Sequence, residues 1–375
     1  MADSYWLSEP AEPFARGADG HVDVAVVGGG VTGCSCALTL AEGGLRVRVH
    51  EARRVASGAS GRNGGFALRG GALGYLEARR RFGADGARDF WLFTERTLDR
   101  MEELAGDAFR RVGSLRLADD DELGDVRAQF EAMREDGIDV EWVDELEPPL
   151  DRLFRAALRH PGDGALQPAR WVRRLAARAA AAGALIAEES PVSSLDELDA
   201  DQVVIATDGY TSGLVPELDE AIRPVRGQVI ATEPVGRMLY PRPHYARFGF
   251  DYWQQLPDTR LVLGGRRDAS LETEFTNEEV VSAAIQEELT AFAAELLGEE
   301  PRVERRWPGI FGATKDEVPL VGPVPGREGV WVSAGYSGHG NVLGLGCGEL
   351  VARAVLGAPA PELEWFDPSR LLAKS

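Results

Sequence analysis

Hydrophobic and polar positions near the start of the chain follow first a strand pattern and then a helix pattern. Val22–Val27 is a nearly continuous apolar run that predicts a buried strand. Small apolar residues from Thr32 to about Gly43 predict a helix, and Arg46–His50 predicts a second strand. The pattern therefore predicts a strand–turn–helix–strand unit.

Apolar residues recur at helical spacing in four later segments. Two stripes, over residues 90–104 and 123–133, predict helices that present a core face. A third helix is expected over 169–182, and a fourth follows the apolar positions from 280 to 296 and ends at Gly298.

Short β patterns fill much of the remainder. Strands are expected at residues 185–187, 191–195, 202–207, 224–232, 244–255 and 261–266. The segment 329–341 predicts a strand and a glycine loop, which lead into a last helix that ends near Leu356. Because this final unit resembles the first, we expect the chain to return to its first domain.

The sequence thus predicts an α/β fold, in which a Rossmann-like nucleotide-binding domain carries an inserted substrate domain with a mainly antiparallel sheet. We assign residues 20–85, 160–220 and 307–360 to the first domain and residues 86–159 and 221–306 to the second. Residues 1–19 and 361–375 are expected to be terminal extensions.

The turn after the first strand carries candidate chemistry. Gly28 permits a tight turn, Gly30 allows the backbone to approach a pyrophosphate, and Gly33 allows the helix to pack closely on the strand. The helix amino terminus directs free N–H groups at phosphates. Glu51 follows at about the spacing, roughly 20 residues, of a carboxylate that binds ribose hydroxyls. Together they predict a dinucleotide site.

Composition narrows the function classes. The 375 residues carry a net charge of −20, which argues against nucleic acid and anionic membranes as partners. No apolar stretch has the length of a membrane span, and the acidic amino terminus does not resemble a signal peptide. Three cysteines and five scattered histidines form no metal-ligand pattern. We expect a cytoplasmic protein without a metal, and the oligomeric state stays open, a monomer included.

Residues 55–65 form a loop of small residues beside the predicted dinucleotide site. Such a loop favours wrapping around a ligand, and a flexible linker is the alternative.

Three separated segments resemble one known family. They are GGGVTG with Glu51, the loop GASGRNGG (58–65) and the loop GYSGHGN (335–341). Together they resemble the D-amino-acid oxidase-like family of FAD-dependent oxidoreductases. The two loops are most similar to the γ-glutamylputrescine oxidase and glycine oxidase branch. The resemblance spans residues 20 to 370 approximately and implies non-covalently bound FAD.

The resemblance also implies which residues contact FAD. Its pyrophosphate would lie at the first glycine loop, its ribose at Glu51 and its adenine at the backbone of Val192. The flavin would lie between the loop at 58–65 and the amino end of the last helix, where a helix dipole stabilises negative charge on a reduced flavin. The implied cofactor residues are Gly28, Gly30, Val31, Thr32, Gly33, Glu51, Ala52, Arg53, Ala59, Ser60, Arg62, Asn63, Gly64, Gly65, Val192, Thr207, Gly335, Gly338, His339, Gly340 and Asn341.

Departures from the family bear on flavin linkage and on the substrate. Gly309 stands where covalent relatives carry a flavin-linking cysteine. Phe311 and Val342 stand where relatives carry carboxylate-binding cations, and Val262 stands near the position of an oxygen-activating lysine. The resemblance therefore implies a substrate other than a small α-amino acid.

Four residues are candidates for substrate contact. The resemblance places Tyr252 and Trp253 in an aromatic wall over the flavin, although a strand pair of this kind equally suits a core. His339 is expected to contact the flavin or to orient the substrate, and Phe311 completes the wall. Whether Arg69, Arg266, Arg267 or Lys315 also contacts the substrate stays open.

The implied activity is oxidation of a C–N bond in a small amine, such as a γ-glutamylated diamine, by hydride transfer to flavin N5. Oxygen or another acceptor would then reoxidise the flavin. Two alternatives stay open: an amino-acid oxidase or dehydrogenase that uses an acceptor other than oxygen, and a flavin-binding assembly protein with little turnover.

Overall fold

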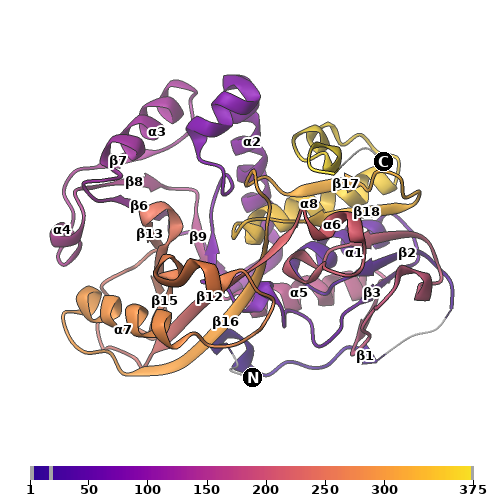
Figure 1. The fold of residues 1–375 in the computed structure, drawn as a ribbon, viewed down its shortest axis with the longest axis horizontal. Coiled ribbons are helices and arrows are strands. Elements are labelled where there is room, and N and C mark those ends of the chain that lie inside the picture. Colours follow the sequence, from indigo (N-terminus) through magenta and orange to yellow (C-terminus); the bar gives the residue numbers. More distant parts are fainter. Residues whose placement is uncertain (1–3, 17–19, 373–375) are drawn as a thin grey trace.

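The computed structural model describes residues 4–16 and 20–372, and two large sheets organise them (Figure 1). The first sheet has seven strands, all parallel to their neighbours except β17, which runs antiparallel to β18. In sheet order these are β1 (Ala15–Arg16), β10 (Leu185–Glu188), β3 (Val47–His50), β2 (Val22–Val27), β11 (Ala200–Ile205), β18 (Val330–Ala334) and β17 (Leu320–Pro323).

The second sheet has eight strands and is antiparallel except where β13 pairs with β6. Its order is β16 (Val303–Ala313), β12 (Arg223–Thr232), β15 (Leu261–Gly265), β14 (Asp251–Gln255), β13 (His244–Ala246), β6 (Ser114–Ala118), β8 (Ala156–His160) and β7 (Glu141–Val143). A third sheet is small and joins β4 (Phe66–Ala67), β9 (Gly164–Leu166) and β5 (Phe109–Arg110). These observations confirm the mixed α/β fold class.

Both faces of the parallel sheet are covered, which explains its nearly continuous apolar strands. In β2, Val24 and Val26 belong to the main core, whereas Val22 and Val27 belong to a separate cluster. Three helices pack beside the sheet, α1 (Val31–Glu42), α5 (Pro168–Ala181) and α8 (Gly340–Val355), and α1 contacts both of the others.

Glycines in α8 allow it to approach α1 closely. A Cβ at Gly344 would lie 2.8 Å from the Thr32 hydroxyl, and one at Gly348 would lie 2.5 Å from the Thr32 carbonyl. Because no side chain fits at these positions, the two helices pack backbone to backbone.

The remaining helices cover other surfaces. α2 (Tyr75–Ala105) packs against α8 and α3 (Leu123–Glu135), whereas α7 (Ala283–Leu297) covers β12 and β15 of the antiparallel sheet. The short helices are α4 (Leu150–Leu153) and α6 (Pro216–Asp219).

The structure differs from several of the expected elements, and the helix expected over residues 90–104 already begins at Tyr75. Residues 191–195 form no strand, and a short 3₁₀ helix begins at Leu195 instead. The expected strand over 244–255 is two strands, β13 and β14, separated by a turn. The helix expected to begin near residue 280 begins at Ala283, and Val280 is 55% exposed.

The domain boundaries suggested by the sequence also cut through packed elements. Phe90 and Phe93, assigned to the substrate domain, pack against Trp365 and Phe366 beside α8. Residues 307–313, assigned to the nucleotide domain, lie within β16 and pair with β12 in the antiparallel sheet.

The terminal segments contribute to the core. Trp6 is 1% exposed and Phe366 is fully buried, and β1 is the edge strand of the parallel sheet. These segments therefore pack as parts of the fold. Residues 1–3, 17–19 and 373–375, which belong to the predicted extensions, lie outside the described residues.

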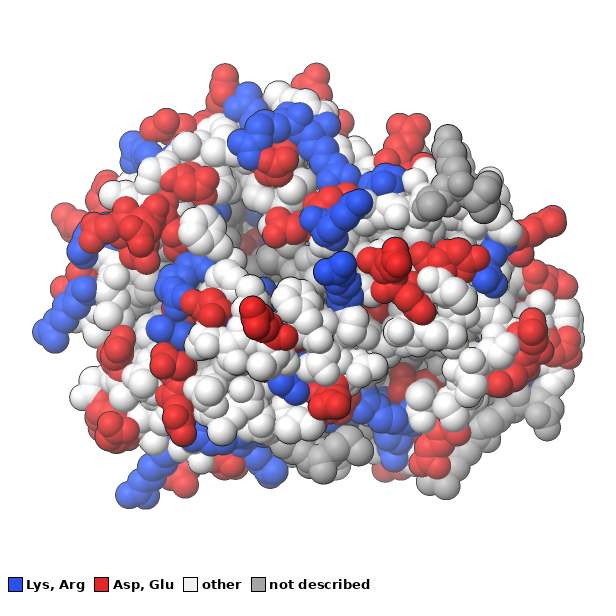
Figure 2. Space-filling model, in the orientation of Figure 1, with Lys and Arg blue, Asp and Glu red and all other residues white. Residues whose placement is uncertain are grey.

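Charged side chains of both signs are interspersed over the face drawn in Figure 2. Among the described residues, no helix has the length and hydropathy that a membrane crossing requires.

Candidate active site

The first glycine loop leaves no room for side chains at its turn. Gly28 has a φ of +113°, and a Cβ there would lie 2.5 Å from the Ala206 carbonyl oxygen. A Cβ at Gly33 would overlap the Gly28 carbonyl oxygen, and one at Gly30 would lie 2.9 Å from the Ser60 hydroxyl. The N-cap residue of α1, Gly30, has no side chain to cap the helix, and of the first N–H groups that of Val31 donates to the Ser60 hydroxyl at 3.1 Å. The helix dipole and free N–H groups are therefore open to an anionic ligand.

Glu51 lies beside this loop at the end of β3. Its carboxylate accepts hydrogen bonds of 2.8 Å from the backbone N–H groups of Gly29 and Arg53. Burial raises the pKa of Glu51, and these two hydrogen bonds oppose that shift. The carboxylate is thereby oriented at the position expected of a ribose ligand.

Two tryptophans fix the loop of small residues at 55–65. The indole N–H of Trp6 donates to the Asn63 carbonyl at 2.7 Å, and that of Trp307 donates to the Arg62 carbonyl at 2.9 Å. Because both indoles are fully buried, the loop is tied to the core on two sides.

Amide side chains hold the same loop against α8 and the antiparallel sheet. Asn63 and Asn341 exchange two hydrogen bonds of 3.1 Å, and Gln254 donates to the Gly64 carbonyl at 2.6 Å. The loop is a structured part of the site, which favours the ligand-wrapping interpretation over a flexible linker.

A buried aspartate fixes the second glycine loop. The Asp208 carboxylate accepts hydrogen bonds from the backbone N–H groups of Gly312 and Gly335, both at 2.8 Å, and of Tyr336 at 3.4 Å. Sequence analysis did not single out Asp208, although it follows an apolar strand that points into this loop. These contacts place the amino end of α8 beside the first loop. His339 is the N-cap residue of α8, and its side chain makes no capping hydrogen bond.

A large cavity lies between the two glycine loops and the antiparallel sheet. Twelve of the predicted cofactor residues line it: Gly30, Val31, Thr32, Ala59, Ser60, Arg62, Asn63, Gly64, Gly338, His339, Gly340 and Asn341. Predicted residues outside the lining are Gly28, Gly33, Glu51, Ala52, Arg53, Gly65, Val192, Thr207, Gly335 and Trp253. Several of these, Glu51 and Gly33 included, support the lining through the contacts described above.

The prediction that Trp253 forms part of the aromatic wall is wrong. Trp253 is fully buried on the far face of the antiparallel sheet, where it stacks on His244 and packs edge-on against Phe292 of α7. Successive residues of a strand point to opposite faces, so only its neighbour Tyr252 lines the cavity. The core alternative holds for Trp253.

Tyr245 is a lining residue that sequence analysis missed. The chain turns at Arg247–Gly249, and β13 pairs with β14 so that Tyr245 lies opposite Tyr252. Phe248 and Gly249 both have positive φ angles. The sequence does contain a pattern that predicts this hairpin, because Gly249 lies between aromatic residues at positions 245 and 252.

Phe311 and His339 both line the cavity. Burial lowers the pKa of His339 to about 4, and the charge of Arg267 adds to this shift. The imidazole is therefore neutral near pH 7, which suits a contact or hydrogen-bonding role.

Of the four cations left open, only Arg267 lines the cavity. Arg69 is buried beside Asp163, Arg266 pairs with Asp251 at 2.9 Å, and Lys315 is exposed.

The described cysteines lie away from the cavity, as buried thiols within α1 and α8. Gly309 lines the cavity, and a Cβ there would lie 3.1 Å from the Arg62 carbonyl. No cysteine is therefore placed to link a flavin among the residues described.

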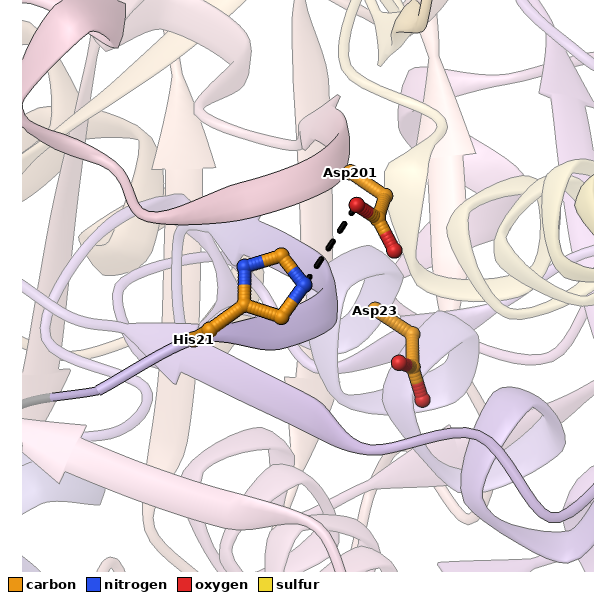
Figure 3. Close-up of side chains that lie close together, drawn as sticks. All are labelled: His21, Asp23 and Asp201. Atoms are coloured by element: carbon orange, nitrogen blue, oxygen red, sulfur yellow. Dashed lines mark ion pairs between the residues drawn. The ribbon is translucent and has the colours of Figure 1, made fainter.

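A surface cluster of His21, Asp23 and Asp201 has the composition of a metal site (Figure 3). Its charges are satisfied within the protein: His21 contacts Asp201 at 3.3 Å, and Asp23 pairs with Arg46. The cluster lies at the starts of β2 and β11, with His21 and Asp201 exposed and Asp23 half-buried, whereas the cavity lies at the ends of these strands.

Comparison with known proteins shows a family whose cofactor is consistent with the cavity and the two glycine loops. The family model for FAD-dependent oxidoreductases, DAO, matches residues 23–354. The chain belongs to this family.

Individual relatives match over most of their length. A probable oxidoreductase, OrdL, of Rhizobium meliloti is 30% identical and is aligned over 93% of this chain and 85% of its own. The γ-glutamylputrescine oxidoreductase of Escherichia coli is 29% identical over 92% of this chain and 85% of its own. The crystal structure of glycine oxidase from Geobacillus kaustophilus superposes with a TM-score of 0.77 at 25% identity, and covers 95% of this chain and all of the other.

FAD is the cofactor of this family, and the residues present fit it. Two helix amino ends whose N-cap residues make no side-chain cap suit the pyrophosphate and the flavin. Glu51 suits a ribose, and the glycines admit a ligand where a Cβ would collide. The chain is therefore an FAD-dependent oxidoreductase with a non-covalent flavin.

Proposed function

We propose that this enzyme oxidises the C–N bond of an extended amine. The observation that carries the proposal is one cavity with two unlike walls: glycine loops and helix ends on one side, and Tyr245, Tyr252 and Phe311 on the other. A flavin on the first wall would present a face to a substrate held on the second.

Bound FAD would supply an acceptor for a hydride from the carbon that carries the amine. The amino end of α8, which begins at Gly340, supports a flavin orientation in which the helix dipole stabilises developing negative charge. Glu51 and the Gly28–Gly33 loop would hold the nucleotide end, and the adenine would lie toward Val192.

The second wall supports an alkyl chain. Tyr252 packs edge-on against Phe66, with ring centres 5.9 Å apart, and Val342 is 2% exposed at the start of α8. Aromatic faces attract an alkylammonium group by about 0.5–2 kcal/mol. Phe311 and Val342 give no cation at the positions where the resemblance places one, which favours extended amines over glycine, sarcosine and D-alanine.

His339 would contact the flavin or the substrate in its neutral form. Its low pKa suits a role in positioning, because oxidation of an amine by hydride transfer asks for little proton transfer from the protein.

A second candidate function is a dehydrogenase that passes electrons to an acceptor other than oxygen. Val262 favours it, because this residue, 1% exposed in β15, puts no positive charge at the position of the oxygen-activating lysine. Mixing the anaerobically reduced enzyme with oxygen, and separately with a quinone, decides between the two. Rapid reoxidation by oxygen supports the oxidase, and reoxidation by the quinone alone supports the dehydrogenase.

The proposed function is tested by mixing the holoenzyme with amines under anaerobic conditions. Loss of the oxidised flavin absorbance with an extended amine supports it. Retention of that absorbance with all amines and amino acids would leave the assembly-protein alternative.

A further inference from the structure

Arg267 stands apart from the other arginines around the cavity. It follows β15 and lines the cavity, with its guanidinium carbon 5.4 Å from the ring centre of Phe311 and 4.8 Å from that of Phe250. No carboxylate of the described residues lies within ion-pair distance, and its guanidinium makes no hydrogen bond to them. Two aromatic rings are thus the contacts of a half-buried cation.

The neighbouring arginines each have an acidic partner. Arg266 pairs with Asp251 at 2.9 Å, and Arg62 lies 3.5 Å from a carboxylate oxygen of Glu279. Burying a charge without a partner costs several kcal/mol, so the other arginines represent the expected arrangement. Arg267 is the exception among the described cavity residues.

The acidic groups nearest to Arg267 are engaged elsewhere. Asp268 pairs with Arg247, and Glu274 pairs with Arg226 at 2.7 Å. Asp208, which also lines the cavity, accepts three backbone hydrogen bonds. Glu317 also lines the cavity but is exposed, at the edge toward solvent. No carboxylate of the described chain is therefore placed to neutralise Arg267.

Two phenol groups share the cavity with this guanidinium. Tyr245 and Tyr252 are direct cross-strand partners, and neither hydroxyl makes a hydrogen bond to a described residue. The charge of Arg267 acts on Tyr252, whose pKa burial raises to about 12, so Tyr252 is a protonated donor near pH 7. A guanidinium and two O–H donors form a donor set suited to a carboxylate.

We propose that Arg267 binds a carboxylate of the substrate, assisted by Tyr252 and Tyr245, and thereby selects amines that carry an acidic group at a distance from the reacting carbon. This inference rests on the proposed function and names its substrate class. It accounts for the apolar Phe311 and Val342: the alkyl chain lies on Phe311 while the acid reaches Arg267 from the β15 side.

Ligand binding tests the carboxylate site without turnover. Pentanoate and its neutral isostere pentanamide are titrated into the oxidised holoenzyme, and binding is followed by the perturbation of the flavin spectrum. We expect pentanoate to bind at least about tenfold more tightly than pentanamide, which corresponds to about 1.4 kcal/mol. Equal affinities in the wild-type enzyme would overturn the inference.

Variants assign that preference to one side chain. Arg267→Met should abolish the preference for pentanoate, and Arg267→Lys should retain part of it. Lys315→Met is the matched control, because it removes one positive charge from an exposed position that does not line the cavity. A preference that survives in Arg267→Met, or that is lost equally in Lys315→Met, would contradict the inference. If Arg267→Met does not fold, the wild-type comparison and Arg267→Lys still decide.

Substrate preference separates this inference from the proposed function. The wild-type enzyme should reduce its flavin with δ-aminovalerate at least about tenfold more efficiently, in kcat/KM, than with pentylamine. Flavin reduction by both amines without any dependence on Arg267 would refute the carboxylate site alone. Arg267-dependent pentanoate binding without reduction by any amine would refute the proposed function alone.

Discussion

The two walls of the cavity are built from different parts of the polypeptide. The cofactor wall is built largely around backbone: glycines of two loops and the amino ends of α1 and α8. The substrate wall consists of side chains that the antiparallel sheet brings together from Tyr245, Tyr252, Arg267 and Phe311. A backbone site requires glycine at fixed spacing and so leaves a readable motif, whereas a side-chain site depends on strand pairing between distant segments.

The largest effect is expected from adding one methyl group to the cofactor wall. Gly33→Ala should unfold the loop or abolish FAD binding, since the new Cβ would overlap the Gly28 carbonyl. Overpacking of this kind costs about 1–3 kcal/mol or more. FAD content after purification and the thermal midpoint measure the effect. Gly124→Ala is the control, because its Cβ meets nothing within 4 Å in α3, and it should leave both properties unchanged or slightly improved.

Two neighbouring residues of β14, Tyr252 and Trp253, should differ in how their substitution affects stability and binding. Trp253→Ala should lower the free energy of unfolding by about 3–5 kcal/mol, because it empties a packed core position. Tyr252→Phe should leave stability within about 1 kcal/mol and should weaken pentanoate binding. Denaturant unfolding and the spectral titration measure the two effects. The reverse outcome, a stable Trp253→Ala variant with impaired binding, would restore Trp253 to the wall.

Glu51 is the side chain on which the cofactor wall most depends. Glu51→Ala should weaken FAD binding by about 1.5–3 kcal/mol, the contribution of a charge-assisted hydrogen bond. Glu51→Gln should weaken it less, since an amide oxygen can still accept from Gly29. The dissociation constant of FAD from the apoprotein is the measurement. Unchanged affinity in Glu51→Ala would remove Glu51 as a ribose ligand.

The smallest expected effect concerns pH and His339. Its pKa of about 4 lies below the ordinary 6.5, so the unfolded chain binds more protons than the native one between these values. This histidine therefore makes stability rise as pH increases from about 4 to about 6.5. His339→Gln should flatten that rise slightly and should leave the activity profile above about pH 7 unchanged in shape. If His339→Gln loses an ionisation that the wild-type pH–activity profile shows, His339 would instead be a proton-transfer group.

The motif-bearing half of the fold could be read from the sequence. Strand β2 has the expected bounds, Val22–Val27, and α1 begins one residue before its expected start at Thr32. Here a single local unit determines both the strand–helix packing and the nucleotide end of the site, so one short segment predicts both.

The substrate half could be read only in part. Residues 244–255 have strand propensity throughout, and the pairing that turns Tyr245 toward Tyr252 is a tertiary choice. The lack of an acidic partner for Arg267 is also a tertiary property. It arises because Asp251, Asp268 and Glu274 pair with other arginines. Trp6 escaped notice because its indole bonds to Asn63, a contact between the terminus and a loop that no periodicity encodes.

The central claim is that one cavity holds a flavin against an amine. Its most direct test is anaerobic flavin reduction by a panel that includes a γ-glutamylated diamine, δ-aminovalerate, pentylamine, glycine, sarcosine and D-alanine. We predict that the extended amines reduce the flavin with kcat/KM at least about tenfold above the small amino acids. A preference of that size for glycine, sarcosine or D-alanine would contradict the account.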